Sequence, residues 1–179
     1  MLQVYNNLTR QKETFKPIIE GQVGLYVCGV TTYDYCHIGH GRTYTAFDVM
    51  ARYLEYSGYD VTYVRNITDI DDKIINRAND NAESFGEVTK RFIDIMHEDF
   101  KALGLREPDL EPRATESIDG IIDIIQTLID KGFAYTGADG DVYYSVAKFA
   151  NYGQLSKQRI DDLRSGERVD VATDKTDPL

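Results

Sequence analysis

The feature that most constrains the fold is a pair of short apolar runs with a helical pattern between them. Residues 23–27 and 61–64 are apolar and β-prone, which is typical of buried strands. Between them, apolar side chains recur at helical spacing from Thr43, and Gly58 supplies a stop. Strand, helix and strand in this order predict two parallel strands joined by a right-handed crossover. We expect residues 23–27 to be buried on both faces, as inner strands of parallel sheets are.

Local signals predict the other elements. Ser84 and Glu87 have the spacing of a capping box, Gly104 ends the following pattern, and the acidic residues at 69–72 suit a helix start because of the helix dipole. The segment 106–113, with two prolines among alternating charges, is the best candidate for a domain boundary. With one strand predicted beyond it, the chain has too few strands for a complete doubly wound sheet. We expect helices at residues 69–81, 84–103 and 117–131, a strand at 142–146, and a short strand at 2–5 in an otherwise loop-like start.

Charge and cysteine content limit the classes of function. The 20 Lys and Arg residues against 30 Asp and Glu give a formal net charge of −10, which argues against a broad basic surface that grips nucleic acid. Two cysteines imply no disulfide framework, so a reducing compartment is expected. The polar first residues do not resemble a signal peptide, and no apolar run reaches membrane-spanning length. These features predict a cytoplasmic protein without a membrane partner.

The junction between the first strand and the helix carries a group of chemically active side chains. His37 and His40 flank Gly39 one helical turn apart, at the carboxyl end of a parallel strand, where such sheets bind ligands. A helix start presents unpaired N–H groups and partial positive charge, and glycine lets a ligand approach the backbone. Two imidazoles can donate hydrogen bonds to phosphoryl oxygens. The pattern therefore predicts a nucleotide triphosphate site.

Two other interpretations of this junction stay open at the level of the residues. The histidines can simply cap the helix while the glycines form a turn, which is the commoner role for a single histidine. Alternatively, both histidines could join Cys28 and Cys36 in a zinc knuckle, although their spacing departs from that of structural zinc sites. The third histidine, His97, is expected on a helix surface without a role.

A series of motifs runs along nearly the whole chain. The strings YVCGVTTYD, HIGHGRT and YVRNITDIDDKI are followed by PDLEPRATE, GDVYYSV, YGQLS and RVDV. HIGH alone is a short signal, but HIGH between these flanking strings is highly specific. The order resembles the N-terminal part of the cysteinyl-tRNA synthetases, a family of class I aminoacyl-tRNA synthetases. The resemblance implies an α/β fold: the first half of a Rossmann-like HIGH-type nucleotidyl-transferase catalytic domain at residues 1–112, then an incomplete connective-peptide insertion at residues 113–179.

The resemblance also implies a reaction. Cysteine and ATP, with Mg²⁺, form cysteinyl-adenylate and pyrophosphate, and the cysteinyl group then passes to tRNA(Cys). His37, Gly39 and His40 match the ATP-binding signature of the family. As catalytic residues, His37 and His40 are expected to stabilise charge on the phosphates rather than to transfer protons.

An amino-acid pocket at the strand ends is implied in the same way. Cys28 matches a ligand of an active-site Zn²⁺ that binds the substrate thiolate, and zinc prefers a thiolate to a hydroxyl, which favours cysteine over serine. Gly29, Thr31 and Thr68 are expected to line the pocket. Cys36 is expected to fill space at the edge of the site.

The family is much longer than this chain. Its remaining zinc ligands, its KMSKS signature and its tRNA-binding C-terminal helices have no match among residues 1–179. We therefore expect a part of the enzyme that is inactive alone: a truncated chain, a proteolytic piece or a natural short product. Two alternatives stay open. One is a related cysteine-activating ligase of thiol biosynthesis, which joins cysteine to a sugar amine; the other is a short paralogue that binds nucleotide without catalysis.

Overall fold

The computed structural model describes residues 2–159, 162 and 175, and the chain divides by its contacts into two compact units. Residues 17–118 form one unit, and residues 1–16 with 119–179 form the other. The division falls shortly after the proline-containing segment 106–113. The sequence did not predict that the first residues of the chain group with the last ones. A domain border between residues 112 and 113 stays a prediction.

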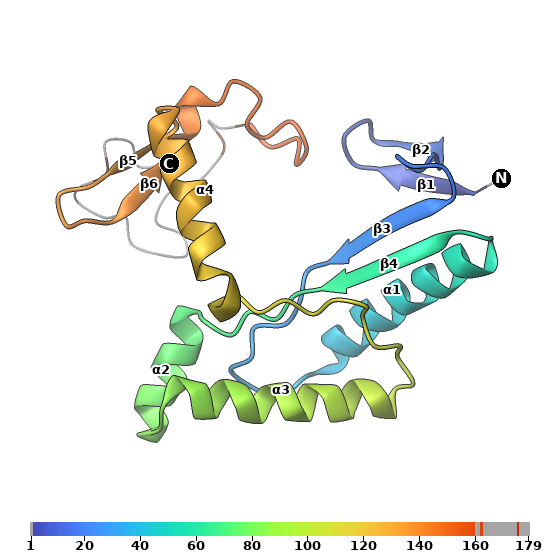
Figure 1. The fold of residues 1–179 in the computed structure, drawn as a ribbon, viewed down its shortest axis with the longest axis horizontal. Helices are drawn as coiled ribbons and strands as arrows, with labels where there is room; N and C mark the ends of the chain where they lie inside the picture. Colours follow the sequence, from blue (N-terminus) through green and yellow to red (C-terminus); the bar gives the residue numbers. More distant parts are fainter. Residues whose placement is uncertain (1, 160–161, 163–174, 176–179) are drawn as a thin grey trace. The chain divides into compact units, whose positions relative to one another are not determined.

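The unit formed by residues 17–118 is built on a parallel strand pair. Strand β3 spans Gln22–Val27, strand β4 spans Asp60–Arg65, and the two pair in parallel along their whole length. Helix α1, Ile38–Tyr56, connects them (Figure 1). The predicted strand–helix–strand unit is therefore confirmed.

Two further helices follow β4, and side chains cap both of them. Helix α2 spans Asp72–Asn81, and its backbone donates to the Asp71 carboxylate. Helix α3 spans Phe85–Ala102. The predicted capping box between Ser84 and Glu87 is present, with each side chain accepting from the other residue's backbone N–H. A polar side chain at the N-cap thus sets the start of each helix.

Helix α1 begins earlier than its apolar pattern indicated. The pattern starts at Thr43, but the helix starts at Ile38, because the side chains of the preceding turn cap it there. The helix ends before Gly58, as predicted. Gly58 has φ +93°, and Gly104, which follows α3, has φ +71°. Glycine adopts such positive φ values without strain.

The proline-containing segment lies along β4 and is not a free linker. The Arg65 N–H donates to the Leu110 carbonyl at 3.1 Å, and the Ile67 N–H donates to the Pro112 carbonyl at 2.9 Å. Two isolated parallel bridges accompany these bonds. Because proline has no N–H to donate, it interrupts regular strand pairing and is tolerated only at a sheet edge. The segment therefore pairs irregularly with β4 and extends the sheet of this unit on that side.

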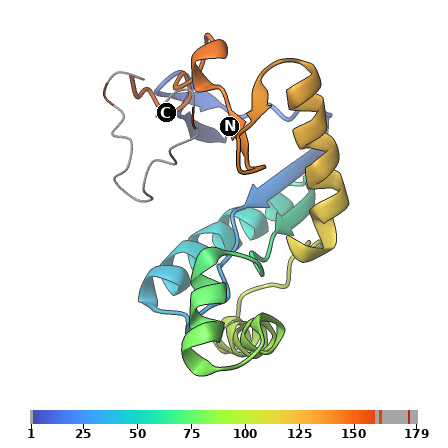
Figure 2. The ribbon, with the colours of Figure 1, turned by 90° about the vertical axis from the view of Figure 1, so that its left-hand side faces the viewer.

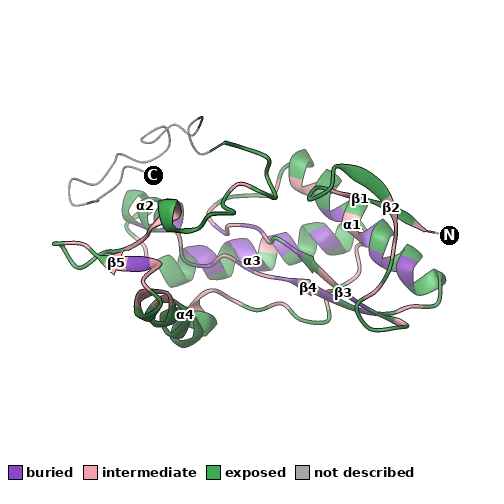
Figure 3. Ribbon diagram, turned by 90° about the horizontal axis from the view of Figure 1, so that it is seen from above, coloured by how far each residue is buried: buried purple, intermediate pink, exposed green. Residues whose placement is uncertain are grey.

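Helices α1 and α3 lie on the same side of the strand pair, and the core lies between these helices and the strands (Figure 1, Figure 2). Figure 3 shows buried positions running along both helices. The main cluster takes side chains from both strand ends and both helices: Val27, Val30, Tyr44, Tyr63, Ile67, Ile93, Met96 and Phe100. A second cluster joins α2 to α3: Ile74, Ala78, Val88 and Phe92. This packing sets the strand ends against the start of α1.

The burial of β3 differs from the prediction. Val23 and Val27 are buried, whereas Gly24 is exposed and Tyr26 is 61% exposed. The expectation of burial on both faces is wrong, because α1 and α3 both cover the face of Val23 and Val27. Gly24 and Tyr26 point to the other face.

Arg65 ends β4 as a buried cation with several partners. It is 3% exposed, and its guanidinium donates to Glu111 Oε1 at 2.6 and 3.1 Å. The same guanidinium lies over the rings of Tyr44 and Phe100, 5.4 and 4.7 Å from their centroids. His97 is a surface residue of α3, as expected, but its Nε2 also lies 2.6 Å from the other Glu111 oxygen. The cluster joins β4, both helices and the proline-containing segment.

Among its described residues, the other unit contains two small antiparallel hairpins. Strand β1, Gln3–Asn6, pairs with β2, Gln11–Thr14, and β5, Ala134–Thr136, pairs with β6, Val142–Tyr144. The predicted strands at residues 2–5 and 142–146 correspond to β1 and β6. The sequence did not reveal β2, because its residues QKET are all polar and show no alternation.

Helix α4, Ile118–Asp130, agrees with the predicted helix at residues 117–131. No described residue of α4 is buried, and Ile122 and Ile124 are 56% and 64% exposed. The RVDV string lies outside the described residues. Of the helices that the structure describes, none has the length and apolar character needed to span a bilayer.

Candidate functional site

The peptide bond after Cys28 follows the last residue of β3 in the chain, and a side chain of helix α1 hydrogen-bonds to it. Cys28 is exposed and its thiol is free. The Tyr44 hydroxyl donates to the Cys28 carbonyl at 3.0 Å. Burial raises the pKa of Tyr44 to about 12, so its hydroxyl stays protonated and remains a donor. The helix whose first turn carries the two histidines therefore also fixes the backbone at Cys28.

Asn66 joins the same turn to the segment after β4. Its Oδ1 accepts from the Gly29 N–H at 2.8 Å and from the Tyr26 hydroxyl at 2.9 Å. The two backbones also approach closely, because a Cβ on Gly29 would lie 1.4 Å from the Asn66 carbonyl oxygen. A side chain at position 29 would thus force the two strand ends apart. In the sequence, the one signal at Asn66 is a polar residue just after a strand, which by itself predicts no role.

Thr31 and Thr68 pair across the same strand ends. A parallel bridge joins them, and the Thr68 N–H donates to the Val30 carbonyl at 3.0 Å. The Asn66 amide donates to the Thr68 hydroxyl at 3.4 Å, which links Thr68 through Asn66 to Gly29. The structure therefore brings the three residues expected in the amino-acid pocket to one place. Their part in binding stays a prediction.

The two histidines cap the start of α1 reciprocally. His37 Nδ1 accepts from the Gly39 N–H, and His40 Nδ1 accepts from the His37 N–H, both at 3.1 Å. The two rings stack at an angle of 33°, with centroids 4.0 Å apart. A Cβ on Gly39 would lie 2.8 Å from the His37 ring, so glycine lets that ring fold back over the helix start. The histidines do cap α1, whereas Gly39 and Gly41 lie in its first turn and do not form a separate turn. A phosphate site at the two rings stays a prediction.

Capping determines which ring nitrogen carries the proton. A ring nitrogen that accepts from an N–H is unprotonated, so the neutral forms of His37 and His40 carry their protons on Nε2. Burial, and then the charge of His37, lower the pKa of His40, which favours its neutral form. The helix start therefore offers two Nε2–H donors and the positive end of the helix dipole to an anion.

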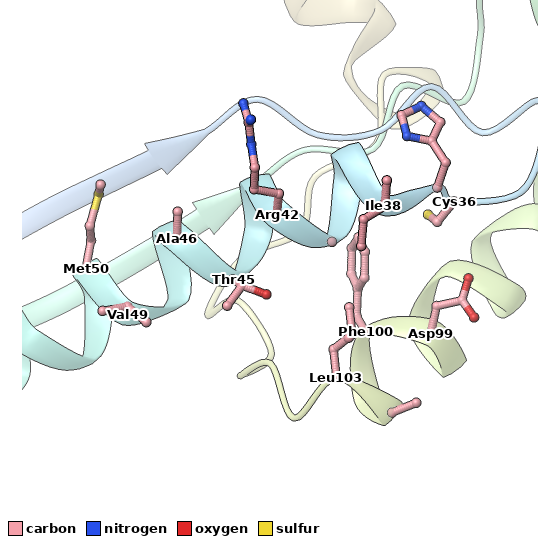
Figure 4. A pocket seen from close by; sticks show the side chains of 13 residues that line it. Cys36, Ile38, Arg42, Thr45, Ala46, Val49, Met50, Asp99, Phe100 and Leu103 are labelled. Atoms are coloured by element: carbon pink, nitrogen blue, oxygen red, sulfur yellow. The ribbon is translucent and has the colours of Figure 1, made fainter.

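A groove of about 910 Å³ borders the same helix start (Figure 4). It runs from His37 along the outer face of α1, over Ala46 and Met50, and Leu103 closes it from the side of α3. Its lining is mostly apolar. None of the four strand-end residues expected in the amino-acid site lines it, so the groove is separate from the turn at Cys28.

The structure agrees with the role expected for Cys36 and disagrees with the role expected for Asp69. Cys36 packs against the core, and burial, with Asp99 nearby, raises the pKa of its thiol, which agrees with a filling role. Asp69 is 4% exposed and does not begin a helix. Its carboxylate accepts from the Thr115 N–H at 2.9 Å and from the Thr115 hydroxyl at 2.6 Å. The dipole explanation is wrong for Asp69 because Asp71 is the cap of α2.

Cys28 is the predicted metal ligand, and its exposed thiol is a donor of the kind that zinc prefers. Among residues 2–159, 162 and 175, no group of three or more His, Cys, Asp or Glu side chains could hold a metal ion. The histidines that a zinc knuckle would need instead cap α1. The described part of the chain therefore contains no complete zinc site, and Cys28 as a zinc ligand stays a prediction.

Known proteins resemble this chain over most of its length. Residues 14–179 match the family model of the tRNA synthetases class I (C) catalytic domain. The cysteine–tRNA ligases of Pseudomonas syringae pv. tomato and Vibrio atlanticus are each 60% identical to it over 179 residues, and that of Pseudomonas entomophila is 61% identical. The whole chain aligns, yet it spans 39% of the length of each relative.

A solved structure shares the fold. Methionyl-tRNA synthetase of Mycobacterium tuberculosis, in complex with methionyl-adenylate, superimposes with a TM-score of 0.56 at 22% identity. The match covers 63% of this chain and 23% of that protein. At this identity the likeness concerns the fold alone, and it confirms the predicted α/β class.

Proposed function

The chain belongs to the family of class I (C) tRNA synthetase catalytic domains, and from this premise we propose that it is the N-terminal part of a cysteine–tRNA ligase. The whole enzyme would convert cysteine and ATP to cysteinyl-adenylate and pyrophosphate, and pass the cysteinyl group to tRNA(Cys) in the cytoplasm. One observation carries the proposal. The exposed Cys28 lies at the end of β3 and is bound through Tyr44 to the helix that begins at the paired histidines.

The helix start is suited to ATP with its Mg²⁺. The Nε2–H groups of His37 and His40 would donate to phosphoryl oxygens, and the positive end of α1 would add to the attraction. Negative charge grows on these oxygens when the cysteine carboxylate attacks the α-phosphorus. Fixed donors stabilise that charge without transferring a proton.

The turn at Cys28 is suited to the amino acid. Cys28 would hold a Zn²⁺ together with ligands from outside the described residues, and the bound zinc would prefer the substrate thiol to a serine hydroxyl. Gly29, Thr31 and Thr68 would surround the substrate at the strand ends. Position 29 needs a glycine because the Asn66 carbonyl oxygen already occupies the place of a side chain there.

The first test is cysteine-dependent exchange of pyrophosphate into ATP. The full-length ligase that contains this sequence should catalyse the exchange. The 179-residue chain should not, because it offers one zinc ligand and spans 39% of its relatives. Exchange above background by the short chain would contradict the second expectation. Activation of another amino acid in place of cysteine by the full-length protein would contradict the proposed function.

The second test is ATP binding to the 179-residue chain, measured by calorimetry. His40→Glu is the informative variant, because a glutamate carboxylate at this helix position can still accept from the His37 N–H but has no hydrogen to donate to a phosphate. We expect weaker ATP binding with unchanged helix content. His40→Ala, which removes the donor and the cap together, is the comparison. Equal affinity of wild type and both variants would exclude this ATP site.

A further inference from the structure

We propose that Asn66 is a positioning residue that sets the direction of the Cys28 side chain for cysteine binding. This inference rests on the function proposed above. It concerns a residue that need not touch the substrate, since Asn66 acts through the peptide bond between Cys28 and Gly29. Three hydrogen bonds of its side chain support the inference.

The peptide between Cys28 and Gly29 is held at both of its polar groups. Its carbonyl accepts from the Tyr44 hydroxyl at 3.0 Å, and its N–H donates to Asn66 Oδ1 at 2.8 Å. A peptide unit is planar, so two bonds in opposite directions fix its rotation. That rotation determines where the Cα of Cys28 directs its side chain. One anchor comes from α1 and the other from the segment after β4.

Asn66 is itself held from two sides. Its Oδ1 accepts a second bond from the Tyr26 hydroxyl at 2.9 Å, and its amide nitrogen donates to the Thr68 hydroxyl at 3.4 Å. These contacts orient the amide group, with its oxygen toward β3 and its nitrogen toward Thr68. The Asn66 side chain therefore couples the metal-ligand position to a residue expected in the amino-acid pocket.

A site held in advance loses less conformational freedom when the ligand binds. Without the Asn66 side chain, the Gly29 N–H loses its acceptor and the peptide keeps the Tyr44 bond alone. The thiol of Cys28 would then sample several directions. The cost should appear in cysteine binding and not in ATP binding, because the capping bonds of the histidines involve neither Asn66 nor Gly29.

The kinetic test uses pyrophosphate exchange by the full-length ligase. Asn66→Ala should raise the KM for cysteine about tenfold, as expected for loss of a partly buried acceptor, and leave the KM for ATP within about twofold. Asn66→Asp keeps an oxygen that can accept from Gly29 and Tyr26, so its KM for cysteine should stay within about threefold of wild type. Asn81→Ala, an exposed asparagine of α2 that donates only to Glu83 among the bonds described, is the matched control.

An independent readout is the exchange rate of the Gly29 amide hydrogen, measured by NMR in the 179-residue chain. Asn66→Ala should speed this exchange at least about tenfold, while Asn66→Asp and Asn81→Ala should not. Unchanged Gly29 exchange in Asn66→Ala, or equal rises in the KM for cysteine and for ATP, would overturn the positioning role. If the wild-type ligase is active and Asn66→Ala has an unchanged KM for cysteine, the positioning role is also overturned, while the proposed function still stands. A full-length wild type that does not activate cysteine would overturn both.

Discussion

The turn at Cys28 and the start of α1 contribute to one proposed site, but they are held in different ways. At the helix start, the bonding partners are two or three residues apart in the chain. At the turn, they are 16, 37 and 40 residues apart. The phosphate half of the site can therefore form from local sequence, whereas the amino-acid half needs both strand ends and α1 in place. Substitutions should disturb the two halves differently.

Gly29→Ala should have the largest effect, because it acts on the long-range half. The new Cβ would lie 1.4 Å from the Asn66 carbonyl oxygen, so the strand ends must separate. We expect a loss of about 3 kcal/mol in the free energy of unfolding, measured with urea. Gly24→Ala, in the same strand, is the control. Its Cβ would meet no described atom within 4 Å, so a change within about 0.5 kcal/mol is expected. Equal losses in both variants would mean that the close approach at Gly29 is not the cause.

His37 tests the local half with a smaller effect. His37→Ala removes the N-cap of α1 and should cost about 1 kcal/mol of stability. His37→Asn should recover most of this loss, because asparagine is a good N-cap, yet it should not recover ATP binding. Thermal unfolding and calorimetry on the same two samples check both outcomes. If asparagine restored ATP binding as well, the imidazole would serve as a cap and nothing more.

The dependence of stability on pH should show the smallest effect. The pKa of His40 is lowered from 6.5 in the folded chain, by burial and then by the charge of His37. The unfolded chain therefore takes up the proton first as the pH falls. Stability should be constant above the unfolded value and decline as the pH drops through it toward the lower folded value. Urea unfolding at about pH 7.5 and about pH 5.5 should show this decline, and His40→Gln should reduce it. A slope of opposite sign would contradict the burial of a neutral His40.

The same contrast explains which features could be predicted from the sequence. The capping box at Ser84 and the glycine stop at Gly58 depend on a few neighbouring residues, and both are present. The bond from Gly29 to Asn66 depends on the register between two strands, which no local pattern reveals. Likewise, Asp69 was read as a helix-start residue because its partner, Thr115, is 46 positions away. The exposure of Tyr26 could not be predicted either, because it depends on which face of the sheet the helices cover.

The expectation that Cys28 binds zinc comes from the family resemblance and not from the local chemistry of the residue. Cys28 alone suggests a small residue at a strand end, and only the surrounding motifs point to a zinc ligand. The structure adds that Cys28 is exposed and that its backbone is anchored. It does not supply the other ligands from the described residues, so the site stays partial.

Because the segment 106–113 pairs with β4 across a long stretch of chain, β4 has to wait for this partner during synthesis. The Tyr63 N–H donates to Asp109 Oδ2 at 2.7 Å, and Arg65 pairs with Glu111, in each case across 46 residues. A chain leaves the ribosome N-terminus first, so β4 emerges roughly 2 to 9 seconds before its partners at usual elongation rates. During that interval its edge and its unpaired arginine face the surroundings, and a sheet edge in this state can pair with another chain.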